Sequence, residues 1–168
     1  MVPVNVFALI ASTAPAPNVI VLKPVESESG ECSDLIVPIL VGIAEAVNLR
    51  VALKEARFCR PLTHDLFLDC LTALDARVDH VLIDRVKGHL FFAKLTISQH
   101  GRFIELDARP SDAISLAIRQ NAPIYVEETV LETAGQLLLP SLQQEEDPDE
   151  LEDFHLFLES IAPEDFAD

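Results

Sequence analysis

The sequence predicts an α+β fold, in which helices pack on a mixed or antiparallel β-sheet and a short C-terminal helix follows. Predicted strands precede predicted helices, and these precede predicted hairpins, so the strict strand–helix alternation of a doubly wound sheet is absent. With 168 residues, 49% of them apolar, the chain can bury the core of one domain. We therefore expect one domain over residues 1–140 and a separate unit over residues 141–168.

Three strands and two helices are predicted for the first half of the chain. Short apolar runs bounded by Pro, Gly and Ser mark the strands. These runs are residues 4–11, 19–23 and 35–41. A helix follows Gly42, because apolar residues recur there with a period near 3.6 as far as residue 54. A second helix begins after Pro61, and Thr63 is its expected N-cap.

Two hairpins and a third helix are predicted for the second half. The expected strands are residues 78–86, 90–98 and 102–107, joined by turns at Lys87-Gly88 and His100-Gly101. The third helix follows Arg109, and Asn121 is expected to end it in the left-handed conformation. A short strand at residues 124–126 and a last helical segment at residues 130–139 complete the domain.

The C-terminal unit combines an acidic linker with a predicted amphipathic helix. Asp147, Pro148 and Glu150 form a helix-start pattern. An apolar stripe follows, formed by Leu151, Phe154, Leu158 and Ile161. A helix this short is marginal in water, so we expect it to dock on its own domain or a sister subunit. Recruitment of another protein is the alternative.

The net charge of −16 is unevenly distributed. Residues 1–140 hold 17 acids and all 12 Lys and Arg, whereas residues 141–168 hold the other 11 acids and no Lys or Arg. The domain is therefore only mildly acidic, but it lacks the basic footprint of a strong duplex-binding protein. Any contact with nucleic acid has to be local or assisted by a metal ion.

Cysteine usage and hydropathy indicate a soluble cytoplasmic protein without a membrane partner. Cys32, Cys59 and Cys70 form no C-x-x-C pair, which argues against a disulfide framework or a thiolate zinc site. We expect them to be buried and reduced. No Lys or Arg precedes Lys23, so the apolar N-terminus is interpreted as a strand rather than a signal peptide. The apolar run at residues 35–53 is interrupted by a proline and charged residues, so it does not span a membrane.

Two segments share one pattern, an Arg-Pro pair followed by a hydroxyl and an acid at an expected helix start. They are Arg60-Pro61-Leu62-Thr63-His64-Asp65 and Arg109-Pro110-Ser111-Asp112. A helix start exposes unpaired N–H groups and carries roughly +0.5 charge, so it attracts anions. If the two starts converge, they form a pocket for phosphate, with Arg60, Thr63, Arg109 and Ser111 as its ligands.

The acids and the histidine of these segments are candidates for chemistry. Asp65, Asp107 and Asp112 supply oxygen ligands for Mg²⁺ or Mn²⁺. His64, with Asp65 and Asp112, is the candidate for moving protons in metal-assisted phosphodiester hydrolysis. Glu45 either caps its helix or completes this site.

A purely structural interpretation of the same residues stays open. An acid in the first turn of a helix contributes about 0.3–1 kcal/mol, and a Ser or Thr cap contributes about 1 kcal/mol. Arg60 and Arg109 then pair with these acids. The other histidines are expected at the surface; they are His80, His89, His100 and His155.

The chain resembles the bifunctional nuclease family in four ordered motifs between about residues 4 and 131. These motifs are residues 38–46 (PILVGIAEA), 60–66 (RPLTHDL), 107–114 (DARPSDAI) and 122–126 (APIYV). The resemblance implies an α+β fold, often dimeric, with nuclease activity on DNA and RNA. The chain departs from the family pattern at Leu40, Ala56 and His89, outside both Arg-Pro motifs.

Three hypotheses follow for the function. The first is a cytoplasmic nuclease that acts on DNA and RNA with Mg²⁺ or Mn²⁺. The second is a regulatory or ligand-binding module that uses the same pocket, with the C-terminal helix as its partner contact. The third is a purely architectural role at the seam of a homodimer. The first two are separated by one observation: whether both arginines and the three aspartates line one open cleft or neutralise one another.

Overall fold

The computed structural model describes residues 1–11, 18–25, 35–56 and 58–137, and confirms the α+β fold. Its strands are β1 (Val2–Ile10), β2 (Asn18–Pro24), β3 (Leu35–Val41), β4 (Ala76–Lys87), β5 (Leu90–Gln99), β6 (Arg102–Ala108), β7 (Ile124–Val126) and β8 (Gln136–Leu137). Its helices are α1 (Ile43–Leu53), α2 (Thr63–Ala73), α3 (Pro110–Gln120) and α4 (Glu128–Ala134). The predicted C-terminal helix, Cys32 and His155 lie outside the described residues.

The strands form one mixed, mostly antiparallel sheet with the order β6-β5-β4-β7-β1-β2-β3-β8. The strands β4–β6 form one antiparallel group, and β1–β3 form another. The short strand β7 joins the two groups, because it runs parallel to β4 and antiparallel to β1. The N-terminal strand is therefore an interior strand of the sheet.

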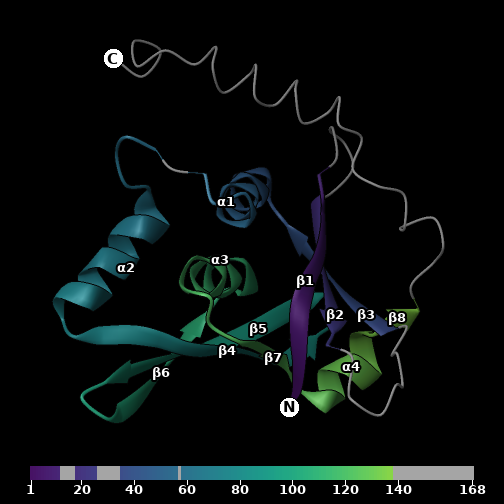
Figure 1. The fold of residues 1–168 in the computed structure, drawn as a ribbon. Helices are drawn as coiled ribbons and strands as arrows, with labels where there is room; N and C mark the ends of the chain where they lie inside the picture. The colour runs from purple at the N-terminus through teal and green to yellow at the C-terminus, as the bar shows by residue number, and fades with distance from the viewer. Residues whose placement is uncertain (12–17, 26–34, 57, 138–168) are drawn as a thin grey trace. The chain divides into compact units, whose positions relative to one another are not determined.

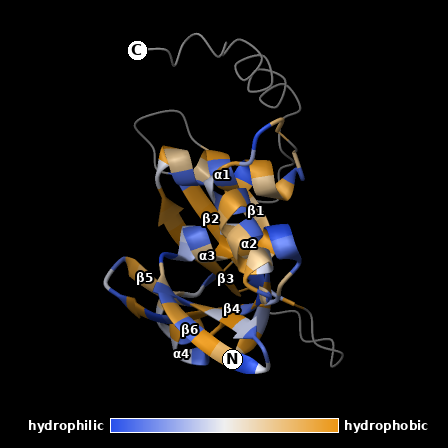
Figure 2. Ribbon diagram, turned by 90° about the vertical axis from the view of Figure 1, so that its left-hand side faces the viewer, coloured by the Kyte–Doolittle hydropathy of each residue, from blue (hydrophilic) through white to orange (hydrophobic). Residues whose placement is uncertain are grey.

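Helices α1 and α3 lie in the angle between the two strand groups (Figure 1). Helix α1 contacts α3, and α2 contacts both α3 and β4. The core between them contains fully buried side chains such as Leu22, Leu49, Ile83 and Ile114. Each such side chain contributes roughly 1.5–3 kcal/mol by leaving water. Strand β2 is mainly hydrophobic along its length, whereas hydrophilic and hydrophobic residues alternate along the helices (Figure 2).

The ends of α2 and α3 show which cap predictions were right. Asn121 has φ of 52° and ends α3 in the left-handed conformation, as predicted. Helix α2 begins one residue earlier than expected, with Leu62 rather than Thr63 as its N-cap. The Asp65 carboxylate accepts the Leu62 N–H at 2.9 Å. Asp65 therefore satisfies the helix start from the third helical position, and Thr63 is an exposed residue of the first turn.

The last predicted helix is present as α4, but it ends earlier than expected. Helix α4 ends at Ala134, and the next residues pair with the sheet edge, with Leu35 opposite Leu137. Gly135 is extended and donates its N–H to the Leu131 carbonyl at 2.8 Å. Pairing with β3 thus decides the conformation of Gln136–Leu137, which helix periodicity alone did not reveal.

Two predictions of burial were also wrong. Cys59 and Cys70 are free but exposed, because Cys70 lies on the outer side of α2. His80 is half-buried rather than a surface residue, since it bonds Asp79 at 2.8 Å and the buried Thr96 at 3.3 Å.

Strand β6 forms the exposed edge of the sheet beside the candidate site. Phe103, Ile104 and Leu106 remain 67%, 43% and 39% exposed, respectively. An exposed apolar edge is a common place for association, and the homodimer stays a prediction. Among the described residues, no helix is both long enough and apolar enough to cross a membrane.

Candidate functional site

The two Arg-Pro segments meet where α2 and α3 begin. His64 lies in the first turn of α2, and Asp112 lies in the first turn of α3. The Nε2 atom of His64 is 3.4 Å from Oδ1 of Asp112. The two helix starts therefore converge, so that an imidazole from one faces a carboxylate from the other.

Arg109, the N-cap residue of α3, is bonded to two carboxylates. Its Nε and Nη2 donate to the two oxygens of Asp112 at 2.7 and 3.2 Å, and its Nη1 donates to Oε1 of Glu45 at 2.7 Å. These hydrogen bonds, that to Asp112 first, raise the pKa of Arg109 above its usual value, so the guanidinium stays charged. The side chain is 65% exposed and remains within reach of a ligand.

Glu45 therefore lies beside Arg109, as expected if it completes the site that the sequence predicted. It lies in the first turn of α1, after Gly42. A Cβ atom at Gly42 would collide with the Glu45 carboxylate. Gly42 thus leaves the space in which this carboxylate folds back toward the start of its helix.

A pocket of about 480 Å³ opens beside the His64–Asp112 pair. Its polar lining is Thr63, His64, Asp107, Arg109 and Asp112. Its apolar lining is Phe67, Leu95, Leu106, Ala108, Ala113 and Leu116. Pockets of this size that combine apolar walls with a few convergent polar groups are typical of small-ligand sites.

The charges around the pocket do not balance. Glu45, Asp107 and Asp112 supply three carboxylates, and Arg109 is the arginine among them. A phosphate group would meet net negative charge here unless a cation accompanied it. The described residues contain no group of three His, Cys, Asp or Glu side chains placed to hold one metal ion.

His64 has an unusual environment. Its side chain is 14% exposed, and its Nδ1 atom is buried without a hydrogen-bond partner in the described part of the chain. A buried polar atom without a partner costs about 1–3 kcal/mol. Such atoms need an explanation, and a catalytic role or a bound water is among the usual ones.

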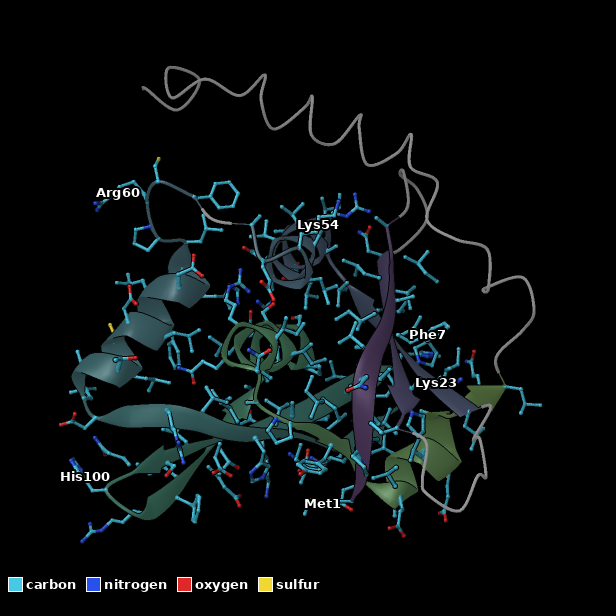
Figure 3. All side chains as sticks on the ribbon, viewed as in Figure 1. Met1, Phe7, Lys23, Lys54, Arg60 and His100 are labelled. Atoms are coloured by element: carbon cyan, nitrogen blue, oxygen red, sulfur yellow. The ribbon has the colours of Figure 1, made fainter. Side chains whose placement is uncertain are left out.

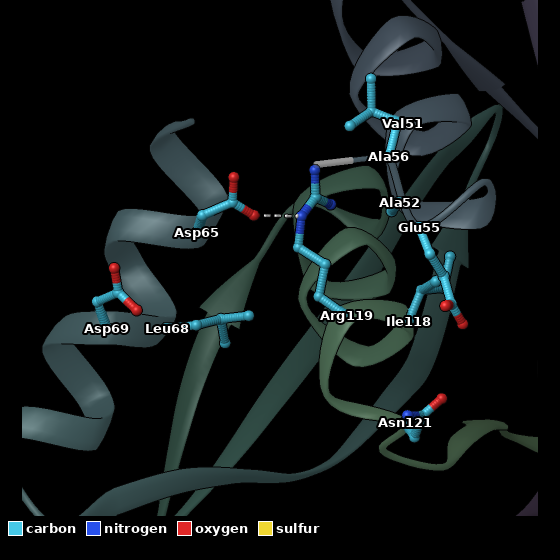
Figure 4. Close-up of a pocket in the computed structure, with 10 residues that line it drawn as sticks. All are labelled: Val51, Ala52, Glu55, Ala56, Asp65, Leu68, Asp69, Ile118, Arg119 and Asn121. Carbon is cyan, nitrogen blue, oxygen red and sulfur yellow. Dashed lines mark hydrogen bonds and ion pairs between the residues drawn. The ribbon is translucent and has the colours of Figure 1, made fainter. Parts of the chain in front are cut away.

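Asp65 is placed elsewhere than expected. Its Oδ1 accepts Nε of Arg119 at 2.9 Å (Figure 4), while its Oδ2 caps α2 through Leu62. Arg119 also donates to the carbonyls of Ser115 and Asn48, at 3.1 and 3.3 Å, and so ties the three helices together. The pair borders a different cavity, of about 410 Å³. The structure therefore does not bring Asp65 together with Asp107 and Asp112.

The expected phosphate ligands are only partly assembled. Thr63 and Arg109 line the 480 Å³ pocket, and Ser111 lines a neighbouring cavity of about 170 Å³ together with Arg109. Arg60 is exposed and points away from the helices (Figure 3). It forms no ion pair with any residue that the structure describes, so the two-arginine pocket is not formed.

Sequence reasoning missed Arg119 and Phe67. Arg119 is the one basic residue of α3 after Arg109, and its isolation on an apolar helix could have indicated a buried ion pair. Phe67 was not singled out as a candidate, yet it lines the pocket and is 38% exposed.

Comparison with known proteins identifies relatives of the chain. Residues 25–138 match the bifunctional nuclease domain. An uncharacterized protein of Mycobacterium tuberculosis is 39% identical over 138 residues, which are 79% of this chain and 82% of that protein. Bifunctional nuclease 1 of Oryza sativa subsp. japonica is 31% identical over 106 residues, which are 61% of this chain and 32% of that protein. Bifunctional nuclease 1 of Arabidopsis thaliana is 27% identical over 129 residues, which are 75% and 38% of the two chains.

The plant relatives are much longer, since the chain spans about a third of their length. The mycobacterial protein, in contrast, is covered over most of its length. The domain match extends over more than half of this chain and includes both Arg-Pro segments. The chain belongs to the bifunctional nuclease domain family.

Proposed function

We propose that the chain hydrolyses phosphodiester bonds of DNA and RNA at the pocket beside His64 and Asp112. The observation that carries this proposal is their 3.4 Å approach across two helix starts, next to an exposed Arg109. The plant relatives named bifunctional nucleases support the same reaction class. Nucleic acid is then the partner, and both DNA and RNA are substrates.

Each of these side chains has a chemical role in the proposed reaction. Water attacks phosphorus and gives its proton to His64, while the bond from phosphorus to the leaving oxygen breaks and that oxygen takes a proton from solvent water. Asp112 orients the imidazole ring and stabilises its charged form. Arg109 offers its guanidinium to a phosphate oxygen once that oxygen displaces one carboxylate partner.

A divalent metal ion fits this proposal with two carboxylate ligands instead of the three that the sequence predicted. Asp107 and Asp112 line the pocket together, whereas Asp65 does not. Mg²⁺ is commonly held by one or two carboxylates together with substrate phosphates, so these two aspartates would hold Mg²⁺ or Mn²⁺. The ion would supply positive charge for the phosphate where the carboxylates exceed the arginine.

The second candidate is a non-catalytic module that binds a small anionic ligand in the same pocket. One observation favours it: three donor atoms of Arg109 are already bonded to Asp112 and Glu45. In this case the arginine would serve to hold α1 against α3, and a ligand would have to compete with the carboxylates.

An assay with a matched pair of histidine variants separates the two. We would measure nicking of supercoiled plasmid and degradation of RNA with Mg²⁺, Mn²⁺ or EDTA. We expect His64→Asn to lower both rates by roughly 10²- to 10⁴-fold. His100→Asn is the control, because His100 is exposed in the hairpin turn between β5 and β6. Equal rates in wild type and His64→Asn would contradict the catalytic proposal and favour the binding module.

A further inference from the structure

The 480 Å³ pocket has an apolar wall that the proposed phosphoryl chemistry does not use. Phe67 from α2 and Leu106 from β6 both line the pocket and remain 38% and 39% exposed. Behind them Leu95, Ala113 and Leu116 are buried. Apolar surface that faces an open pocket is stabilised when a ligand covers it and displaces water.

A nucleic acid carries one kind of group that matches such a wall. The bases have apolar faces, and they lie within one nucleotide of the phosphate that undergoes hydrolysis. In a duplex these faces are stacked on their neighbours, whereas an unpaired base can stack on an aromatic side chain. Besides the imidazole of His64, Phe67 is the aromatic side chain among those that line this pocket.

We propose that the wall binds an unpaired nucleobase stacked on Phe67, so that the chain acts on single strands, and on transiently unpaired stretches such as those of a supercoiled plasmid, in preference to stable duplex. This inference rests on the proposed function, because it names the substrate form of the same site. The base would sit next to His64 and Arg109, with its phosphate beside the guanidinium.

The charge distribution favours base stacking on Phe67 over phosphate contacts as the main source of binding affinity. Arg60 points away from the site, and Arg109 is shared with two carboxylates. Few phosphate contacts are therefore available, and these contacts dominate binding in most duplex-binding proteins. Stacking does not depend on such contacts, and it tolerates every base because each has an aromatic face. Binding of both DNA and RNA without sequence readout follows from the same chemistry.

The absence of tryptophan from the sequence provides a direct test. Phe67→Trp places the chain's single tryptophan in the wall, and Phe103→Trp places it on β6, at a side chain that is 67% exposed and not part of the pocket lining. Both are made in the His64→Asn background so that the oligonucleotide is not consumed. The probes are a single strand of about ten nucleotides and a blunt duplex of the same sequence, each with Mg²⁺.

We expect the single strand to quench the tryptophan at residue 67 and not at residue 103, at concentrations at least tenfold below those needed with the duplex. In a separate anisotropy measurement, Phe67→Leu should bind the labelled single strand about tenfold more weakly, which corresponds to about 1.4 kcal/mol. This variant keeps an apolar side chain and so preserves folding if the tryptophan does not fit.

Several outcomes would overturn the inference. Equal quenching at both reporters, equal affinity for the duplex, or unchanged affinity of Phe67→Leu each exclude a base on Phe67. If Phe67→Leu instead shifts sedimentation from dimer to monomer without loss of oligonucleotide affinity, the wall is a subunit interface. Specific quenching without hydrolysis by the wild type would support the base site and refute the proposed nuclease activity. Hydrolysis without preference for single strands would support the nuclease activity and refute the base site.

Discussion

Replacement of Asp65 by asparagine tests whether this carboxylate is structural or catalytic. Each oxygen of Asp65 has a partner, since Oδ1 accepts Nε of Arg119 and Oδ2 accepts the Leu62 N–H. Asparagine keeps one acceptor oxygen and loses the negative charge. The variant therefore removes one of two hydrogen bonds and leaves the guanidinium, whose side chain is 9% exposed, without its anion.

The size of the effect follows from the burial of the two partners. A hydrogen bond to a charged group contributes about 1.5–3 kcal/mol, and breaking a fully buried ion pair costs about 3–5 kcal/mol. Asp65 is 39% exposed, so water compensates part of the loss. We expect the free energy of unfolding to fall by about 2 kcal/mol, which lowers Tm by roughly 4–8 °C in a chain of this size.

Urea denaturation and the nuclease assay together show whether Asp65 is structural or catalytic. Asp65→Asn should lower the midpoint of unfolding without changing the m value, and should keep its hydrolytic rate at temperatures where it is folded. Asp69→Asn is the matched control, because Asp69 lies one turn further along α2, is exposed and borders the same cavity. It should change stability by less than about 0.5 kcal/mol. Loss of hydrolysis with unchanged stability would refute the structural role of Asp65 and restore it to the catalytic set.

Two further predictions concern the start and the end of α3. Arg109→Lys should lower kcat/KM for plasmid nicking at least tenfold at constant folded fraction. One ammonium group cannot bond Asp112, Glu45 and a phosphate in the fork geometry of a guanidinium. Unchanged kinetics would mean that Arg109 does not contact the substrate. Asn121→Ala should lower the free energy of unfolding by about 1 kcal/mol, because Asn121 has φ of 52°, whereas Asn121→Gly should keep it within about 0.5 kcal/mol. Equal urea midpoints for the alanine and glycine variants would show that the left-handed conformation does not matter there.

Local signals in the sequence predicted most of the elements. The hairpin between β5 and β6 has His100 and Gly101 at positive φ, as the turn residues indicated. The helix starts at both Arg-Pro segments were located within one residue. These features depend on neighbouring residues, and a sequence pattern records such dependence directly.

Features that depend on distant segments were not predictable in the same way. The placement of β7 between β4 and β1 is fixed by packing across the whole domain. The three residues of β7 do not by themselves indicate with which strands they pair. Likewise, Asp65 and Asp112 follow similar Arg-Pro motifs. Arg119, at the far end of α3, forms an ion pair with Asp65 but not with Asp112. The exposure of Cys59 and Cys70 also reflects the position of α2 on the fold rather than the residue type.

The central position of β7 has a consequence for synthesis of the chain on the ribosome. Val2 of β1 pairs with Val126, and Val81 of β4 pairs with Ile124. The β1–β2 hairpin thus leaves the ribosome long before β7, the strand that joins it to the remainder of the sheet. Until then, the edge of β1 that pairs with β7 has no partner. Contacts so distant in sequence slow folding, and unpaired strand edges invite aggregation meanwhile. The edge of β1 therefore stays unpaired, and open to aggregation, until β7 has been synthesised.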